Sequence, residues 1–286
     1  MFNQSTYTRR MAKYDTFMSI ERIKEIAPAI FAETPHQSRS ERYGFVPTEI
    51  LLKGMETEGF LPVSVTQASS RRENGETAAK HLIRFRHQSI QPVQGLFPEI
   101  ILLNSHDGST QYHLMTGIYR QICTNGMIAG DIYGDCKVPH KAGALDRVIE
   151  GSYEIVKETP RLLDAVAEMQ GTNLSTQEIK VFARAALALK YEPSNKDEAP
   201  ITIDQINQAR RIEDNGSDIW RTFNRAQENL IRGGLSGYRR DENGRHRRTT
   251  TREIKAVGQT VSINRGLWVL AEEMKKIKNG AIDLAA

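Results

Sequence analysis

A basic segment in the C-terminal third holds the side chains best suited to binding chemistry in this chain. Residues 232–252 contain seven arginines and two acidic residues, Asp241 and Glu242, for a net charge of +5. The whole chain of 286 residues carries +4 at pH 7, so the rest of the chain sums to −1. Guanidinium groups bind phosphate in a bidentate manner and stack on bases, and such a local excess is typical of nucleic-acid-binding proteins. The segment therefore predicts a polyanion-binding loop, and a solvated surface loop is the alternative for a charge run of this kind.

The arginines and one aromatic residue of this segment are candidate contacts for nucleic acid. Single-strand binders combine phosphate neutralisation with stacking of bases on aromatic rings, and Tyr238 is the residue that we expect to stack. The arginines expected to contact phosphate are Arg239, Arg240, Arg245, Arg247, Arg248 and Arg252.

A helix is predicted immediately before the basic segment. Apolar residues from Ile219 to Leu230 recur at helical spacing, and Gly233 ends the pattern. Three arginines repeat the same spacing on a second stripe and extend the expected cationic surface: Arg221, Arg225 and Arg232. Trp220 is a further stacking candidate, whereas Phe223 lies on the apolar stripe and is expected in the core.

Three further arginines fall where a sheet is predicted. The segment KHLIRFRHQ, at 80–88, alternates apolar and basic residues. Because successive side chains of a strand point to opposite faces, Ile83 and Phe85 share one face and Arg84 and Arg86 the other. We expect the arginine face to lie in solvent, with Arg120 beside it along one cationic groove.

The periodicity of the chain predicts the fold class α+β, with a small antiparallel or mixed sheet flanked by helices and an all-helical C-terminal half. Strands are expected at 62–69 and 80–88, which alternate, at the apolar run 97–105, and at 110–116 after the Asp-Gly turn. A short helix is expected within 117–130 after the last strand, ending near Asn125 and Gly126. Helix is expected from about residue 142 onward, with a kink or a break at Thr159–Pro160 and a further helix that begins at a capping box of Ser175 and Glu178. The Pro- and charge-rich segment 191–202 is the expected domain boundary. Three regions follow: an N-terminal arm at 1–18, a core domain at 19–190, and a helical C-terminal region at 203–286 that carries the basic loop.

Composition restricts the class of protein. The chain is 39% hydrophobic and 26% charged, with two cysteines. It has no apolar run near the ~20 residues of a membrane span, and its first residues lack the apolar core of a signal peptide. We expect a soluble cytoplasmic protein without disulfides and with no membrane partner. Met11 offers a second start, so either Met1 or Met11 begins the native chain.

Other residues able to do chemistry lack the spacing that a reaction requires. The possible zinc ligands His106, His113, Cys123, Cys136 and His140 match no known zinc pattern. Asp131 and Asp135 are loop acids, and the sequence nominates no third acid for a metal-dependent nuclease. We expect no metal, no cofactor and no catalytic residue.

Three segments of the chain are similar to a family catalogued as domain of unknown function 932, which occurs on phages, plasmids, prophages and other mobile elements. They are SIERIKEIAPAIFAETPHQSRSERYGFVPT, PEIILLNSHDGSTQYHLMTGIYRQICTNGMI and WRTFNRAQENLIRGG. The motif IYRQICTNGM is the most specific part. The resemblance implies a mobile-element setting, and the family name supplies no activity.

The expected order of helix, strands, Asp-Gly hairpin and helix also resembles the core of single-strand annealing proteins such as phage Red beta and Erf. That resemblance implies a cationic groove beside the sheet for single-stranded DNA, and subunits that assemble into rings or filaments. Fold-level likeness does not establish function.

The function predicted from the sequence is non-enzymatic binding of nucleic acid, with single-stranded DNA favoured, during annealing in recombination or replication. One alternative is an interaction protein that counters a host defence or regulator by docking its basic loop on an acidic protein surface. The other is an enzyme acting on nucleic acid, with its site drawn from His106, Asp107, His113 or Cys123.

Overall fold

The computed structural model describes residues 17–37, 39, 44–69, 76–122, 125–191, 199–240 and 244–280. Most of the predicted N-terminal arm, Cys123 and the acidic pair Asp241 and Glu242 lie outside these ranges. The chain divides into two compact units, residues 1–160 and 161–286. The division falls at Pro160, well before the boundary that the sequence predicts at 191–202.

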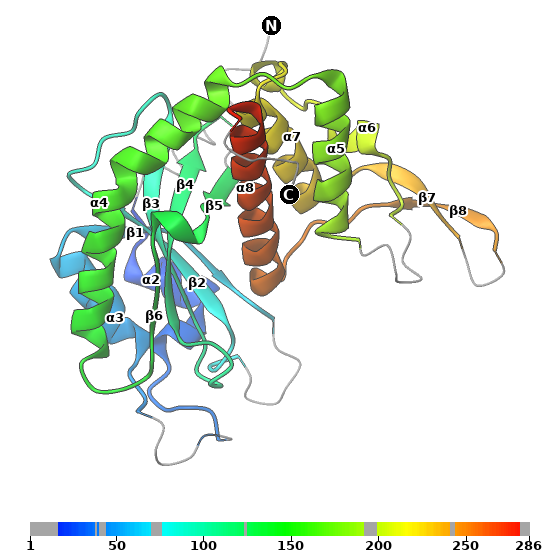
Figure 1. The fold of residues 1–286 in the computed structure, drawn as a ribbon. Coiled ribbons are helices and arrows are strands. Elements are labelled where there is room, and N and C mark those ends of the chain that lie inside the picture. The colour runs from blue at the N-terminus through cyan, green and yellow to red at the C-terminus, as the bar shows by residue number, and fades with distance from the viewer. Residues whose placement is uncertain are drawn as a thin grey trace, which may run out of the picture. The chain divides into compact units, whose positions relative to one another are not determined.

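The first unit is built on an antiparallel sheet, which has six strands among the described residues. Its path is β1 (Phe60–Gln67), β2 (His81–His87), β3 (Leu96–Asn104), β4 (Tyr112–Arg120) and β5 (Asn125–Ile128), and β6 (Asp135–Val138) pairs with β4 beside β5 (Figure 1). The strands predicted at 62–69, 80–88, 97–105 and 110–116 are confirmed as β1 to β4.

Helices pack on one face of this sheet. They are α2 (Ile20–Ile26), the short 3-10 helix η1 (Pro28–Phe31), α3 (Thr48–Thr57) and the first half of α4 (Ala144–Gly171). Their apolar residues meet Ile83 and Phe85 of β2 and Ile100 of β3 in one core cluster. The predicted core face of β2 is therefore confirmed.

The helix predicted over 117–130 is wrong. Gly117 to Arg120 continue β4, and they pair with β5 in the register Gly117↔Ile128 to Arg120↔Asn125. This hairpin satisfies the backbone groups of both segments, so pairing prevails over the weak helical pattern.

The second unit contains the rest of α4, then α5 (Thr176–Ala188), α6 (Ile203–Ile206), 3-10 helix η3 (Ile212–Asp214), α7 (Ile219–Arg232) and α8 (Val257–Lys278). The predicted capping box of Ser175 and Glu178 begins α5. Trp220 is 3% exposed, stacks on Phe223 with ring centroids 5.6 Å apart, and meets Trp268 edge-on. Trp220 is thus a core residue, and its proposed role in base stacking is wrong.

Two details of the predicted helical half differ from the structure. The strands β7 (Ser236–Arg240) and β8 (His246–Thr250) pair as an antiparallel ribbon, here called the hairpin, so the C-terminal half is not all-helical. Tyr238 and the threonines of β8 favour strands, and Gly244 supplies a positive φ of 76° in the connection. Pro160 lies inside α4 without ending it. None of the described helices has the length and hydropathy that crossing a membrane requires.

Candidate nucleic-acid interface

The sheet arginines are internal ion-pair partners. Arg84 is 9% exposed, and its Nε donates to Glu99 Oε2 at 2.5 Å while Nη2 donates to the Met127 carbonyl at 3.0 Å. Arg86 Nη2 lies 2.9 Å from Glu99 Oε1. The expectation that both face solvent is wrong, because the buried carboxylate of Glu99 on β3 holds both guanidinium groups against the sheet.

Aromatic rings enclose Arg86 further. Its guanidinium carbon lies 4.2 Å from the centroid of Phe97 and 4.6 Å from that of Tyr119. Arg120, at the end of β4, is 7% exposed. The cationic groove predicted along this face from Arg84, Arg86 and Arg120 is therefore absent from the described surface, since these charges are engaged inside the unit.

Glu99 is a site residue that periodicity alone does not single out, although the sequence carries a signal for it. Glu99 is the one acidic residue in the apolar run FPEIILL. A carboxylate at such a position requires a cationic partner when the strand is buried. The neighbouring strand carries Arg84 and Arg86, so the ion pairs follow once the two strands are paired.

The arginines of α7 are also engaged by their own unit. Arg225 is 6% exposed and donates through Nη1 to the carbonyls of Asp214 and Gly216, at 2.7 and 2.8 Å. Burial lowers the pKa of Arg225 from its usual range. Arg221 pairs with Asp218 at 2.6 Å and Arg232 with Glu228 at 3.1 Å. The predicted cationic stripe on this helix is therefore a set of internal contacts.

The segment before α7 explains this outcome. Arg211 Nη2 lies 2.5 Å from Glu228 Oε1, and Arg210 Nε donates to Asn229 Oδ1 at 2.6 Å. Arg221 Nε donates to the Glu213 carbonyl at 3.0 Å. Residues 210–216 thus cover the polar side of α7, which the helical pattern alone assigns to solvent.

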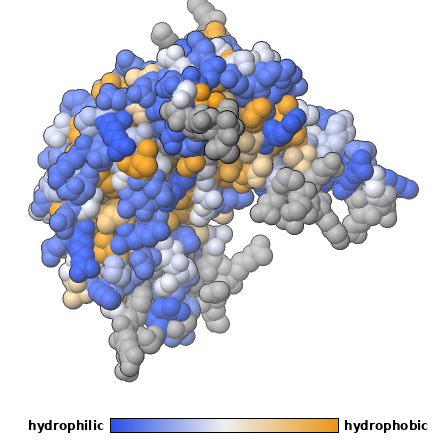
Figure 2. All heavy atoms as spheres, viewed as in Figure 1, coloured by the Kyte–Doolittle hydropathy of each residue, from blue (hydrophilic) through white to orange (hydrophobic). Residues whose placement is uncertain are grey.

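The hairpin β7–β8 is where the predicted basic residues remain at the surface. Tyr238 is 63% exposed. The six arginines expected to contact phosphate are all exposed: Arg239, Arg240, Arg245, Arg247, Arg248 and Arg252. The hairpin extends away from the helices of its unit (Figure 1), and Figure 2 shows hydrophilic residues over its described part. The hairpin thus carries many basic side chains at the surface and few apolar side chains that could pack in a core.

Pairing register orders the hairpin side chains. Tyr238 lies opposite Arg248, Arg239 opposite Arg247, and Arg240 opposite His246. Tyr238 N donates to the Pro200 carbonyl at 3.0 Å, and Gln205 Nε2 donates to the Ser236 carbonyl at 2.7 Å. The basic loop predicted from the sequence is thus a hydrogen-bonded ribbon fixed at its base.

A buried polar cluster in the first unit is centred on Thr48, the first residue of α3. The Thr48 hydroxyl is 3.0 Å from His81 Nε2 and 3.1 Å from His106 Nε2, and it accepts from Asn104 Nδ2 at 3.0 Å. The rings of Tyr112 and His140 have centroids 4.3 Å apart beside it. Burial lowers the pKa of His81 to about 4 and that of His106 to about 3, so both are neutral near pH 7.

The other reactive candidates are structural where the structure describes them. His113 Nε2 lies 2.8 Å from Asp135 Oδ2 on neighbouring strands, and Asp107 accepts from the Ser109 amide in its turn. Burial raises the pKa of the Cys136 thiol, which disfavours the thiolate. Within the described ranges, no three His, Cys, Asp or Glu side chains are placed to hold a metal ion.

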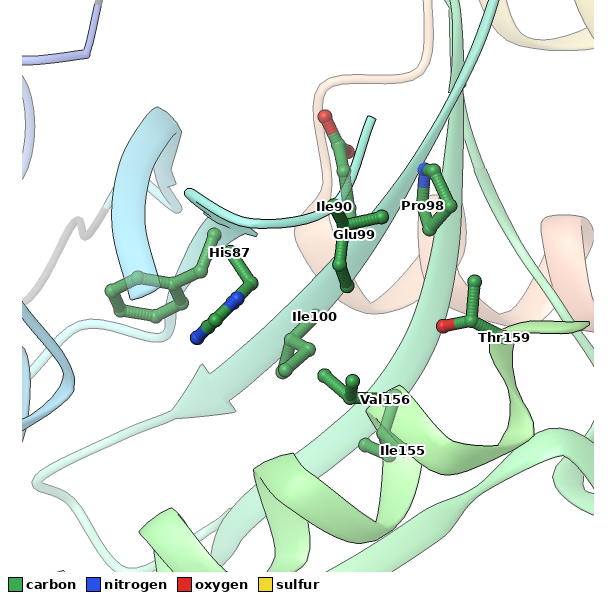
Figure 3. Close-up of a pocket in the computed structure, with 9 residues that line it drawn as sticks. His87, Ile90, Pro98, Glu99, Ile100, Ile155, Val156 and Thr159 are labelled. Carbon is green, nitrogen blue, oxygen red and sulfur yellow. The ribbon is translucent and has the colours of Figure 1, made fainter. Parts of the chain in front are cut away.

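A small hollow between the sheet and α4 offers little for recognition (Figure 3). Ile100, Ile155 and Val156 gather on one side of it, while the Glu99 carboxylate points away from them. That carboxylate is already occupied by Arg84 and Arg86. The hairpin is therefore the best candidate for an interface.

Comparison with known proteins places this chain among relatives that share nearly its whole length. The family described as "Domain of unknown function (DUF932)" matches residues 35–268. The UPF0380 protein YfjQ of Escherichia coli strain K12 is 38% identical over 264 residues, covering 92% of this chain and 94% of the relative. The UPF0380 protein YafZ of the same strain is 37% identical over the same shares. No solved structure matches the chain.

Proposed function

This chain belongs to the DUF932 family, and because that description names no activity, we propose a function from the geometry of the interface: the protein binds nucleic acid through the β7–β8 hairpin. Single-stranded DNA is the partner that we favour, in the recombination or replication of a mobile element. Annealing and assembly into a ring or filament belong to the same proposal.

The observation that supports this proposal is the contrast between two sets of arginines. Arg84 and Arg225 are buried against a carboxylate or carbonyls, so transfer to a phosphate would leave those groups unpaired at a cost of about 3–5 kcal/mol for a buried ion pair. The hairpin arginines are exposed, so a phosphate can reach them from solvent without the opening of a buried ion pair. Of these two sets, the hairpin arginines are the ones that a polyanion can contact at the surface.

The same contrast limits the analogy with annealing proteins. A groove beside the sheet would need Arg84, Arg86 and Arg120 at the surface, and the strand β5 occupies the place of the expected helix. We therefore assign binding to the hairpin alone and leave the sheet arginines out of it.

A charge-matched pair of variants tests the proposal. The hairpin variant replaces five arginines by glutamine: Arg239, Arg240, Arg245, Arg247 and Arg248. The control replaces five exposed cations of the first unit: Arg22, Lys24, Lys53, Arg147 and Lys157. Each variant lowers the net charge from +4 to −1. Any difference between them therefore reports the position of the charges and not their number.

Binding of a labelled single-stranded oligonucleotide is measured at salt concentrations from about 50 to 200 mM. We expect the hairpin variant to lose affinity and its log–log salt slope to flatten by up to about 3.5 units, at about 0.7 per phosphate contact. The control variant should bind like the wild type. Equal losses in both variants, or none in the hairpin variant, would refute the assignment.

A further inference from the structure

The two faces of the hairpin present different chemistry. Strand alternation and the register place Tyr238, Arg240, His246 and Arg248 on one face, here called the platform face. All four are exposed. The opposite face carries Arg239 and Arg247 together with Gly237 and Thr249, which are half-buried.

Contacts within the second unit hold the opposite face. A Cβ atom on Gly237 would lie only 1.7 Å from the Pro200 carbonyl oxygen, so this side of β7 is pressed against residue 200. The positive charge of Arg239 acts on the phenol of Tyr191 and lowers its pKa, against the larger effect of burial, which raises it. The platform face therefore points away from the residues that anchor the ribbon.

Every long side chain of the platform face ends in a planar group. The phenol of Tyr238, the imidazole of His246 and the guanidinium groups of Arg240 and Arg248 are all groups on which unpaired bases stack. Tyr238 exposes 63% of its surface, more than the other exposed tyrosine of the described chain, Tyr153 at 37%. A large exposed ring among cations is suited to a ligand that has both π faces and phosphates.

The spacing of these side chains distinguishes a single strand from a duplex. Side chains at positions i and i+2 of a strand are about 6.7 Å apart, twice the rise of about 3.3–3.4 Å per residue. Successive bases of a B-form duplex lie about 3.4 Å apart and cover each other's faces. A duplex cannot offer base faces at the spacing of Tyr238 and Arg240, whereas an extended single strand can.

We infer that the platform face is a stacking surface for the unstacked bases of an extended single strand. Tyr238 is its main contact, Arg240 is the neighbouring stacking group, and the other arginines of the hairpin contact the phosphates. This inference rests on the proposed function and specifies its substrate class. Bases stack on Tyr238 without sequence readout, because every base has a π face. The interaction is therefore selective for strandedness and tolerant of sequence.

The test uses the full-length protein and three probes of equal length: an unstructured single-stranded oligodeoxynucleotide, a strand of abasic sites, and a duplex. We expect Tyr238→Ala to weaken binding of the first probe by about 5- to 150-fold, the equivalent of about 1–3 kcal/mol for one stacked base. Binding of the abasic strand and of the duplex should stay within about twofold, because phosphate contacts dominate there. Tyr238→Phe should bind like the wild type, and Thr250→Ala is the matched control on the same face.

The salt slope separates this inference from the proposed function. Tyr238→Ala should leave the slope for the single strand unchanged, whereas the arginine variant flattens it. Salt-dependent binding that ignores Tyr238→Ala, or a loss equal on all three probes, overturns the stacking inference and leaves the proposed function standing. Failure of the wild type to bind any probe overturns both, as does capture of an acidic protein partner by a hairpin that binds none of the probes.

Discussion

Thr48 links two buried histidines that burial keeps neutral. His81 Nδ1 lies 2.9 Å from the Ala79 carbonyl and must carry its proton, so Nε2 of the neutral ring accepts from the Thr48 hydroxyl. The Thr48 oxygen then accepts from Asn104 Nδ2 and from Nε2 of His106. One hydroxyl thus makes hydrogen bonds to three buried side chains, with both rings neutral.

We expect Thr48→Val to destabilise the protein by at least about 1–3 kcal/mol, because an isosteric apolar side chain leaves several buried polar groups without a partner. Thr57→Val is the matched control, since Thr57 is exposed at the other end of the same helix. The control should change the free energy of unfolding by less than about 0.5 kcal/mol. Urea denaturation measures both, and equal effects would show that the cluster around Thr48 is not a structural hub.

The same histidines predict a pH dependence of stability. Their folded-state pKa values, about 4 for His81 and about 3 for His106, lie below the value of about 6.5 for an unfolded chain. As the pH falls below about 6.5, these histidines bind protons in the unfolded chain but stay neutral in the folded protein. The free energy of unfolding therefore decreases. Between pH 6.5 and about pH 4, the free energy of unfolding should fall by up to about 1.4 kcal/mol per pH unit for each histidine.

Urea midpoints between pH 7 and pH 4.5 check this expectation. Replacing His106 by glutamine should remove about one histidine's share of the slope, while His246→Gln, on the exposed hairpin, should leave the slope unchanged. A midpoint that stays constant across this range would contradict the burial of neutral histidines.

Among the secondary-structure elements, β2 and β3 are joined by ion pairs as well as by the hydrogen bonds between their backbones. Glu99, with a side chain only 1% exposed, binds Arg84 and Arg86 of the neighbouring strand. This arrangement reverses the expectation that Arg84 and Arg86 face solvent, where their replacement by alanine would leave folding intact. Removal of these arginines leaves a buried carboxylate without its partners.

We expect Glu99→Ala to cost about 3–5 kcal/mol, because it leaves Arg84 buried without a counter-charge. The matched control is Glu25→Ala, which breaks the pair of Arg22 and Glu25 at the surface, with side chains 57% and 64% exposed. That pair should contribute about 0.2–1 kcal/mol at most. Thermal and urea unfolding measure the difference, and a Glu99 effect as small as that of Glu25 would refute an internal role for these pairs.

At the scale of the whole molecule, the hairpin region dominates the charge distribution. Residues 232–252 carry +5 in a chain of net +4, so the remaining surface is close to neutral. We expect nucleic-acid binding by the wild type to weaken linearly in a log–log plot against salt, with a slope of about −0.7 for each phosphate contacted on a single strand. Fluorescence anisotropy over a salt series measures the slope, and salt-insensitive binding would exclude a phosphate-dominated interface.

Secondary structure depends largely on residues that are close in the sequence, so local sequence patterns predicted many of the helices and strands. The alternation of 80–88 placed Ile83 and Phe85 in the core, and the capping box of Ser175 and Glu178 began a helix where expected. Periodicity failed for residues 117–130, where pairing with β4 supplied hydrogen bonds that the segment cannot obtain alone. Periodicity also failed for the hairpin, because its many charged residues do not show the alternation of apolar and polar residues that predicts a strand.

Four features could be predicted from the residues alone: the family, the α+β class, the core face of the strands and the segment in which positive charge is concentrated. These follow from composition and from periods of two and 3.6 residues, which need no knowledge of distant neighbours. Which arginines are exposed to a ligand became clear from the folded structure. Arg84 meets Glu99 from another strand and Arg225 meets the carbonyls of 214 and 216, whereas Arg248 lies on an exposed ribbon. The availability of a charge depends on the partners that folding brings to it, and no local pattern contains them.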